Sequence, residues 1–210
     1  MSRECGGCLR LHRSSNQGVV VVEIRKEQLD VLFSAEQLQS RIRELGRQIT
    51  EDYQGRELHI VAVLKGSFVF LADLVREIDL QVSIDFLGLS SYGASTKTSG
   101  VVRMTQDLSL PIEGRDVLVV EDIVDTGLTI DYLIENMMTR QPNSLEICTL
   151  LHKPARQRVE PSVGLKYIGF TIPDQFVIGY GLDYAENFRN LPYIGVVNTC
   201  LLYTSDAADE

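Results

Sequence analysis

The sequence lacks a long hydrophobic run and a positive net charge, and each absence excludes a class of protein. No stretch of about 18 apolar residues occurs, so no membrane-spanning helix is expected. The net charge is −9, which disfavours non-specific nucleic-acid binding, because that binding depends on Lys and Arg neutralising phosphates. The start of the chain does not show the basic, apolar and small-residue order of a secretory signal. We therefore expect neither a membrane nor a nucleic-acid partner.

A complete set of cysteine or histidine metal ligands is also missing. Cys5 and Cys8 form a C-x-x-C pair, which could be half of a zinc site or a redox pair. No second such pair and no pair of histidines completes a ligand set, so we interpret them as free thiols in a leader segment. Cys148 lies in an apolar run and is expected in the core. Reduced cysteines are typical of cytosolic proteins, which predicts a cytoplasmic location.

The 210 residues, 44% of them hydrophobic, suffice for one domain with a sizeable core, or for a domain and a small lobe. Residues 1–27 are interpreted as an N-terminal extension that is disordered in part, and residues 28–198 as the domain. The last eleven residues, from Cys200 to Glu210, resemble a translated sequencing-library adapter. We therefore expect residues 199–210 to be a non-native tail without function.

Buried-strand patterns alternate with helical patterns along the domain, without an internal repeat. Helices are expected over 35–53, 68–78 and 130–140, and strands over 58–64, 82–89, 101–107, 116–120 and 145–151. This alternation predicts a single α/β domain with a parallel sheet.

The most informative stretch joins the strand at 116–120 to the helix that follows it. Glu121 and Asp122 come where the strand should end, and a turn of small residues from Asp125 to Thr129 leads into the helix. Backbone N–H groups and hydroxyls at a helix N-terminus suit a phosphate. The neighbouring carboxylates can hold hydroxyls or a divalent cation. The pattern fits a sugar phosphate with magnesium, although an ordinary strand-to-helix turn is an equal alternative on these residues alone.

Two further segments allow a functional and a structural interpretation. Lys65, Gly66 and Ser67 follow the strand at 58–64, where a cation and free N–H groups could receive a pyrophosphate, or where the lysine could simply be solvated. Residues 90–100 are small and polar, which is typical of a mobile lid or of a loose hairpin connection.

Three longer sequence segments decide between these interpretations. Residues 119–129 resemble the phosphoribosyl pyrophosphate (PRPP) motif of type I phosphoribosyltransferases. Residues 64–74 resemble the pyrophosphate loop of the hypoxanthine-guanine phosphoribosyltransferase family, in which the bond between Leu64 and Lys65 is expected to be cis. Residues 172–184 match the same family, and the resemblance extends over roughly residues 28–198, closest to bacterial members.

The resemblance implies a fold and a reaction. The fold is α/β, with a five-stranded parallel core sheet flanked by helices and a small hood subdomain built from the terminal parts of the chain. The reaction is the Mg2+-dependent conversion of a 6-oxopurine and PRPP into the nucleoside 5′-monophosphate and pyrophosphate, through an oxocarbenium-like transition state. Family members are homodimers or homotetramers, which implies the same for this chain.

The resemblance also assigns roles to individual residues. Asp125 is expected to be the general acid/base at purine N7, although an Asx-type turn bond is its competing role. Leu128 stands where some relatives carry lysine, and its backbone is expected to serve. Ser91 and Tyr92 match the flexible loop that closes over PRPP. The residues expected to bind PRPP and its phosphates are Lys65, Gly66, Ser67, Glu121, Asp122, Asp125, Thr126, Gly127, Leu128, Thr129 and Arg189.

The resemblance also implies residues for the purine and metal sites. Lys153 is expected to bind the exocyclic oxygen of the purine, Phe176 to stack on the ring, and Val177 to read the base edge through its backbone. Asp183 is placed at the purine side as a magnesium ligand, together with Glu121 and Asp122.

Two other functions remain open at this point. One is a non-catalytic PRPP-sensing regulator of the same fold, which the acidic charge and the presence of Asp125, Lys153 and Arg189 disfavour. The other is a transferase for xanthine, adenine or a pyrimidine, of which adenine is disfavoured by Lys153. The sequence does not rank hypoxanthine against guanine.

Overall fold

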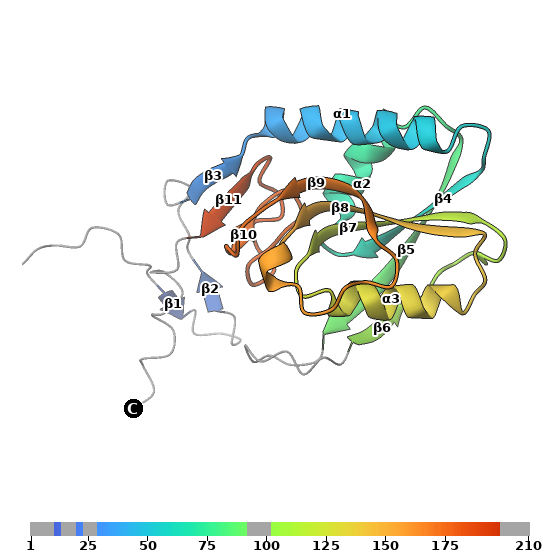
Figure 1. Cartoon of the computed structure of the whole chain (residues 1–210). Coiled ribbons are helices and arrows are strands. Elements are labelled where there is room, and N and C mark those ends of the chain that lie inside the picture. The colour runs from blue at the N-terminus through green and yellow to red at the C-terminus, as the bar shows by residue number, and fades with distance from the viewer. Residues whose placement is uncertain (1–10, 14–19, 23–28, 92–101, 198–210) are drawn as a thin grey trace, which may run out of the picture. The chain divides into compact units, whose positions relative to one another are not determined.

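The computed structural model describes residues 11–13, 20–22, 29–91 and 102–197 (Figure 1). The chain divides into two compact units, one of residues 36–174 and one of the terminal segments 1–35 and 175–210. The terminal parts of the chain thus form a unit of their own, as the resemblance implies for a hood. The domain limits at residues 28 and 198 stay a prediction.

The larger unit is built on a six-stranded sheet with the order β6-β5-β4-β7-β8-β9. Five neighbouring strands run parallel and β6 is antiparallel at one edge, which confirms the expected parallel core and adds a strand to it. The strands are β4 (Leu58–Leu64), β5 (Val82–Ser91), β6 (Val102–Gln106), β7 (Asp116–Val124), β8 (Ser144–His152) and β9 (Leu165–Thr171).

Helices cover both faces of this sheet. Figure 1 shows α1 (Ala35–Asp52) and α3 (Leu128–Met138) on opposite sides of it. The apolar stripe predicted for α1 is fully buried, at Leu38, Ile42, Leu45 and Ile49. The short α2 (Phe68–Leu74) continues as a 3-10 turn, η2 (Val75–Glu77), and a second 3-10 turn, η3 (Pro154–Arg156), follows β8. On the α3 face, the apolar side chains of the helix pack with those of the central strands.

The junction between β7 and α3 differs from the prediction at both elements. The strand was expected to end at Val120, but β7 pairs with β8 through Val124, so Glu121 and Asp122 lie within a strand. The helix was expected from Ile130 to Arg140 and instead runs from Leu128 to Met138, because the left-handed backbone of Gly127 ends the turn and starts the helix there. The two carboxylates are therefore carried by a paired strand and not by a loop.

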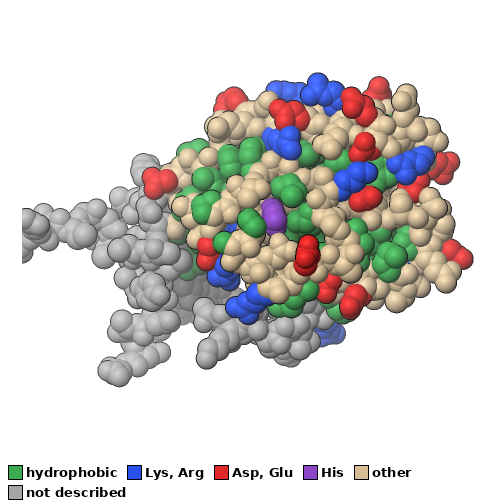
Figure 2. All heavy atoms as spheres, in the orientation of Figure 1, with side chains coloured by type: hydrophobic (Ala, Val, Ile, Leu, Met, Phe, Trp, Pro, Cys, Tyr) green, Lys and Arg blue, Asp and Glu red, His purple; other side chains and the backbone are tan. Residues whose placement is uncertain are grey.

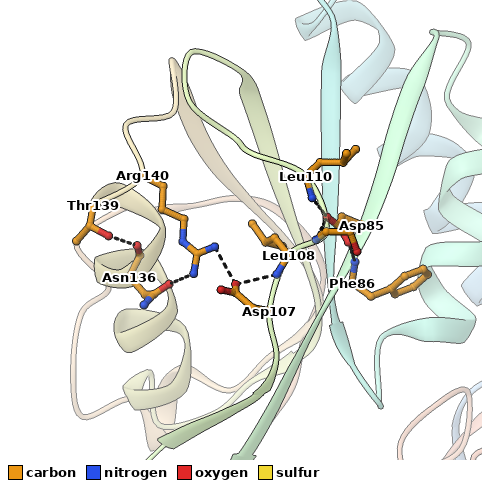
Figure 3. A network of polar contacts seen from close by, with 9 residues as sticks. Asp85, Phe86, Asp107, Leu108, Leu110, Asn136, Thr139 and Arg140 are labelled. Atoms are coloured by element: carbon orange, nitrogen blue, oxygen red, sulfur yellow. Dashed lines mark hydrogen bonds and ion pairs between the residues drawn. The ribbon is translucent and has the colours of Figure 1, made fainter.

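The connection from β6 to β7 is anchored by a buried carboxylate. Asp85 accepts hydrogen bonds from the backbone N–H groups of Ser109 at 2.7 Å and Leu110 at 3.0 Å (Figure 3). Burial would raise the pKa of Asp85, but its backbone donors outweigh burial, and the pKa lies below its ordinary value. Nearby, Asp107 pairs at 2.8 Å with Arg140, which lies two residues after the end of α3.

The smaller unit contains a three-stranded antiparallel sheet with the order β10-β11-β3. Its strands are β3 (Leu29–Phe33), β10 (Val177–Ile178) and β11 (Ile194–Val197), around a small core of Leu29, Ile178, Leu191 and Val197. A separate hairpin pairs β1 (Leu11–Arg13) with β2 (Val20–Val22).

Basic and acidic side chains are interspersed on the face shown in Figure 2, so neither sign of charge dominates it. Within the described ranges, no helix has both the length and the apolar character that crossing a membrane requires. Cys148 is buried as predicted, and burial raises the pKa of its thiol.

Candidate active site

The order of the strands creates a switch point between β4 and β7. These two strands are parallel neighbours, and the chain proceeds from β4 to β5 on one side and from β7 to β8 and β9 on the other. In open α/β sheets, ligands bind outside the carboxyl ends of the strands at such a point. The turns predicted to hold pyrophosphate and phosphate, at 65–67 and 125–129, follow these two strands. The sheet therefore brings both turns to the same edge.

The turn before α3 is shaped for an anion. Gly127 is the N-cap, with a φ of +84° and no side-chain cap on the helix. The first N–H groups of a helix have no partner within it, and the helix dipole favours negative charge there. Thr126 and Thr129 are partly exposed beside them. The geometry therefore suits the phosphate that was predicted for residues 125–129.

Residues 157–159, which follow η3, pack against this turn. The carbonyl oxygen of Thr126 accepts hydrogen bonds from the backbone N–H groups of Arg158 at 2.9 Å and Val159 at 3.3 Å. A Cβ atom on Gly127 would lie 2.3 Å from the carbonyl oxygen of Val159. Both the left-handed φ and this close approach require glycine.

The lysine turn touches the acidic end of β7. A Cβ atom on Gly66 would lie 1.6 Å from Oδ2 of Asp122, so the backbone of the turn packs directly on that carboxylate. Ser67 is fully buried, and its hydroxyl donates to the carbonyl oxygen of Val63 at 2.6 Å. Its hydroxyl therefore anchors the turn, while Lys65 is exposed. The peptide bond between Leu64 and Lys65 is cis, as the resemblance implied.

The two carboxylates of β7 differ in their surroundings. Glu121 is buried, and its pKa is raised well above the ordinary value, first by burial and then by the charge of Asp122. Asp122 is half-buried, and its Oδ1 accepts the N–H of Ile123 at 3.0 Å.

Asp125 and Lys153 come from the ends of adjacent strands. The backbone N–H of Lys153 donates to the carbonyl oxygen of Val124 at 2.9 Å, and its side chain is buried. Asp125 is partly exposed and accepts a hydrogen bond from Nε of Arg156 at 3.2 Å. The predicted base-binding lysine and the predicted general acid/base thus each lie directly after the carboxyl end of one of two neighbouring strands.

The other predicted purine, metal and pyrophosphate residues belong to the smaller unit. Phe176 is 39% exposed and meets Tyr184 edge to face, with ring centroids 5.6 Å apart. Val177 is buried in β10. Asp183 pairs with Arg189 at 2.8 Å, and the buried Nε of Arg189 has no hydrogen-bond partner in the described part of the chain. Ser91 is the last residue of β5, and Tyr92 lies outside the described residues.

Sequence reasoning missed the segment that follows Lys153. Arg156 pairs with Asp125, and the backbone of Arg158 and Val159 holds Thr126. The sequence gives one weak signal, an arginine shortly after a proline-containing turn. A single cation near a turn is usually solvated, so this pattern alone does not identify a functional arginine.

Two carboxylates near the end of β7 are candidate ligands for a metal ion. Among the described residues, no group of three or more His, Cys, Asp or Glu side chains is placed to hold one. Mg2+ is usually bound by one or two carboxylates together with waters and substrate phosphates. Glu121 and Asp122, beside two candidate phosphate turns, fit that mode of binding.

The comparisons with known proteins agree with this geometry. The model of the phosphoribosyl transferase domain matches residues 30–185. A hypoxanthine-guanine phosphoribosyltransferase of Dictyostelium discoideum is 53% identical over 170 residues, which cover 79% of this chain and 93% of that protein.

Two solved structures are similar as well. A hypoxanthine phosphoribosyltransferase from Staphylococcus aureus has a TM-score of 0.79 and 47% identity, covering 85% of this chain and 96% of the other. The enzyme from Trypanosoma cruzi, solved with its product IMP, has a TM-score of 0.75 and 42% identity, covering 84% and 98%. The chain belongs to the phosphoribosyltransferase family. It is an enzyme, and its family requires a divalent metal ion.

Proposed function

We infer that this chain is a purine-salvage transferase that converts hypoxanthine, and guanine as well, with PRPP into IMP or GMP and pyrophosphate. The observation that carries this inference is the meeting of the lysine turn, the acidic end of β7 and the phosphate turn at one switch point. The similar enzymes from Dictyostelium discoideum and Trypanosoma cruzi support the choice of purine.

The phosphates of PRPP are assigned to the two turns. The N–H groups at the start of α3, with the hydroxyls of Thr126 and Thr129, hold the 5′-phosphate. Lys65 and the N–H groups of Gly66 and Ser67 hold the pyrophosphate. Positive charge and N–H donors stabilise the negative charge that develops on pyrophosphate as its bond to ribose C1 breaks.

Arg189 is assigned a second contact with the pyrophosphate. Its buried Nε lacks a hydrogen-bond partner among the described residues, and its guanidinium is held by Asp183. A buried donor that is satisfied only by substrate favours the liganded state.

Each residue proposed for the purine is assigned a separate role. Lys153 donates to the 6-oxo oxygen, Phe176 stacks on the ring, and the backbone of Val177 meets the base edge. Asp125 accepts the proton from N7 while N9 forms the bond to C1. A carboxylate within hydrogen-bonding reach of N7–H suits that transfer.

Magnesium is the proposed divalent ion. Glu121 and Asp122 would hold it together with the ribose hydroxyls and substrate phosphates. Asp183, a residue of the smaller unit, is also proposed as a ligand of Mg2+. When bound, Mg2+ neutralises charge on the leaving pyrophosphate.

The decisive experiment is an assay of nucleotide formation from PRPP and each of hypoxanthine, guanine, xanthine and adenine, with Mg2+ added or replaced by EDTA. The wild-type chain and Asp125→Asn are compared under saturating substrate. We expect IMP and GMP to form with Mg2+, and kcat to fall about 100-fold or more in Asp125→Asn, within the range of general acid/base catalysis. Turnover of xanthine alone, or PRPP binding without turnover of any base, would refute the proposed function.

We also propose that the chain forms a homodimer or homotetramer in the cytoplasm, as members of its family do. Light scattering after size-exclusion chromatography measures the oligomer directly, and a monomer at micromolar concentration would contradict this part of the proposal.

A further inference from the structure

The segment between β8 and β9 carries a residue whose contacts point to a role in the reaction. Arg156 ends η3, three residues after Lys153. Its Nε donates to Oδ1 of Asp125 at 3.2 Å, and its NH1 group lies 3.6 Å from Oδ2 of Asp174. The guanidinium is thus held between two carboxylates. Its pKa is raised by the charge of Asp125 and then by that of Asp174, so it stays positively charged.

The backbone around Asp125 is fixed by the same segment. The carbonyl oxygen of Val124 accepts the N–H of Lys153, and that of Thr126 accepts the N–H groups of Arg158 and Val159. Asp125 therefore sits between two backbone positions that the β8–β9 connection holds. What remains free is the rotation of its side chain, and Arg156 restricts that rotation by binding one carboxylate oxygen.

The other carboxylate oxygen is left for a ligand. Within the described chain, Arg156 is the hydrogen-bond partner of Asp125, through Oδ1. Oδ2 has no such partner among the residues described, and the side chain is 35% exposed. An Asp held by one oxygen presents the second in a defined direction, which a proton transfer over hydrogen-bond distance requires.

We propose that Arg156 is a positioning residue, which holds Asp125 in the orientation that accepts the proton from purine N7, and that Asp174 holds Arg156 in turn. This inference rests on the proposed function, because it assigns Asp125 to that proton. Arg156 itself does not touch the reacting atoms.

A double-mutant cycle tests the inference. The variants are Arg156→Gln, Asp125→Asn and the combination of both, assayed for kcat and for the KM of PRPP and hypoxanthine. Because the pair is partly exposed, we expect Arg156→Gln to lower kcat about three- to tenfold and to leave the KM of PRPP unchanged. In the Asp125→Asn background, Arg156→Gln should change kcat less than twofold, since the group that it orients no longer accepts the proton.

Two further variants distinguish a loss of Asp125 orientation from a mere loss of positive charge. Arg156→Lys keeps a donor and should recover part of the loss. Arg47→Gln removes the same charge from an exposed position of α1, where the side chain has no partner in the described part of the chain, and should leave kcat unchanged. Thermal unfolding of all variants checks that each is folded.

Failure of the positioning role and failure of the proposed function give different results in these assays. If the wild-type chain converts no purine, both the function and this inference fail. If Asp125→Asn is impaired while Arg156→Gln is fully active, the function stands and the positioning role is refuted. Equal losses from Arg156→Gln in both backgrounds, or an equal loss from Arg47→Gln in the wild-type background, would show a structural or general charge effect and would also refute the role.

Discussion

Replacement of Gly127 by alanine is expected to weaken both the fold and the binding of the 5′-phosphate. The φ of Gly127 is +84°, and its added Cβ atom would lie 2.3 Å from the carbonyl oxygen of Val159. A left-handed backbone costs a residue with a Cβ about 1–2 kcal/mol. Relief of the contact must move the segment whose two N–H groups bond Thr126, and each such bond contributes about 1 kcal/mol. We expect Gly127→Ala to lower the free energy of unfolding by about 3 kcal/mol.

Two other glycines provide matched controls. Gly114 has a φ of +68° and open space where a Cβ would stand, so Gly114→Ala should lose only the backbone part, about 1–2 kcal/mol. Gly164 has open space and no left-handed φ, so Gly164→Ala should change stability by less than about 1 kcal/mol.

The assay is urea unfolding followed by circular dichroism, together with the KM of PRPP at saturating hypoxanthine. The KM of PRPP should rise about tenfold or more in Gly127→Ala, because the N–H groups that face the phosphate move with the turn. It should stay unchanged in both controls. Equal destabilisation of Gly127→Ala and Gly114→Ala would refute the contact with Val159 as a determinant of the turn.

Three other changes have defined outcomes. Gly66→Ala places a Cβ atom on the carboxylate of Asp122, and we expect kcat to fall about 100-fold or more by steady-state assay, with Gly164→Ala again as the control. Lys153→Met removes a buried cation and should raise the KM of hypoxanthine about tenfold or more while that of PRPP is unchanged, and an unchanged KM of hypoxanthine would contradict its role in reading the base. The pKa of Asp85 is lowered in the fold, so its stabilising contribution is complete above the pKa of an unfolded aspartate and is lost as pH falls through the folded value. Asp85→Asn should therefore lower the free energy of unfolding at pH 7 by about 1–3 kcal/mol and reduce its loss between pH 5 and pH 3, measured by urea unfolding at each pH.

The local features of this protein could be read from its sequence. The apolar run of β4, the helical spacing of α1 and the small residues before α3 each follow from contacts within a few residues. The strings at 64–74 and 119–129 indicated the family, which the comparisons confirm. The predicted roles of individual site residues remain predictions for the assays above.

The tertiary structure decided what depends on long-range pairing. β7 extends through Glu121 and Asp122 because β8 pairs with it as far as His152, a register that no local pattern encodes. A strand was predicted over 101–107, but the antiparallel direction of β6 was not, since that direction is set by its partner β5. Arg156 reaches Asp125 only because the ends of β7 and β8 lie side by side, although 31 positions separate the two residues in the chain. At Gly127, local sequence and tertiary structure both contribute. The sequence predicts a tight turn there, and the fold brings the carbonyl oxygen of Val159 so close that only glycine fits.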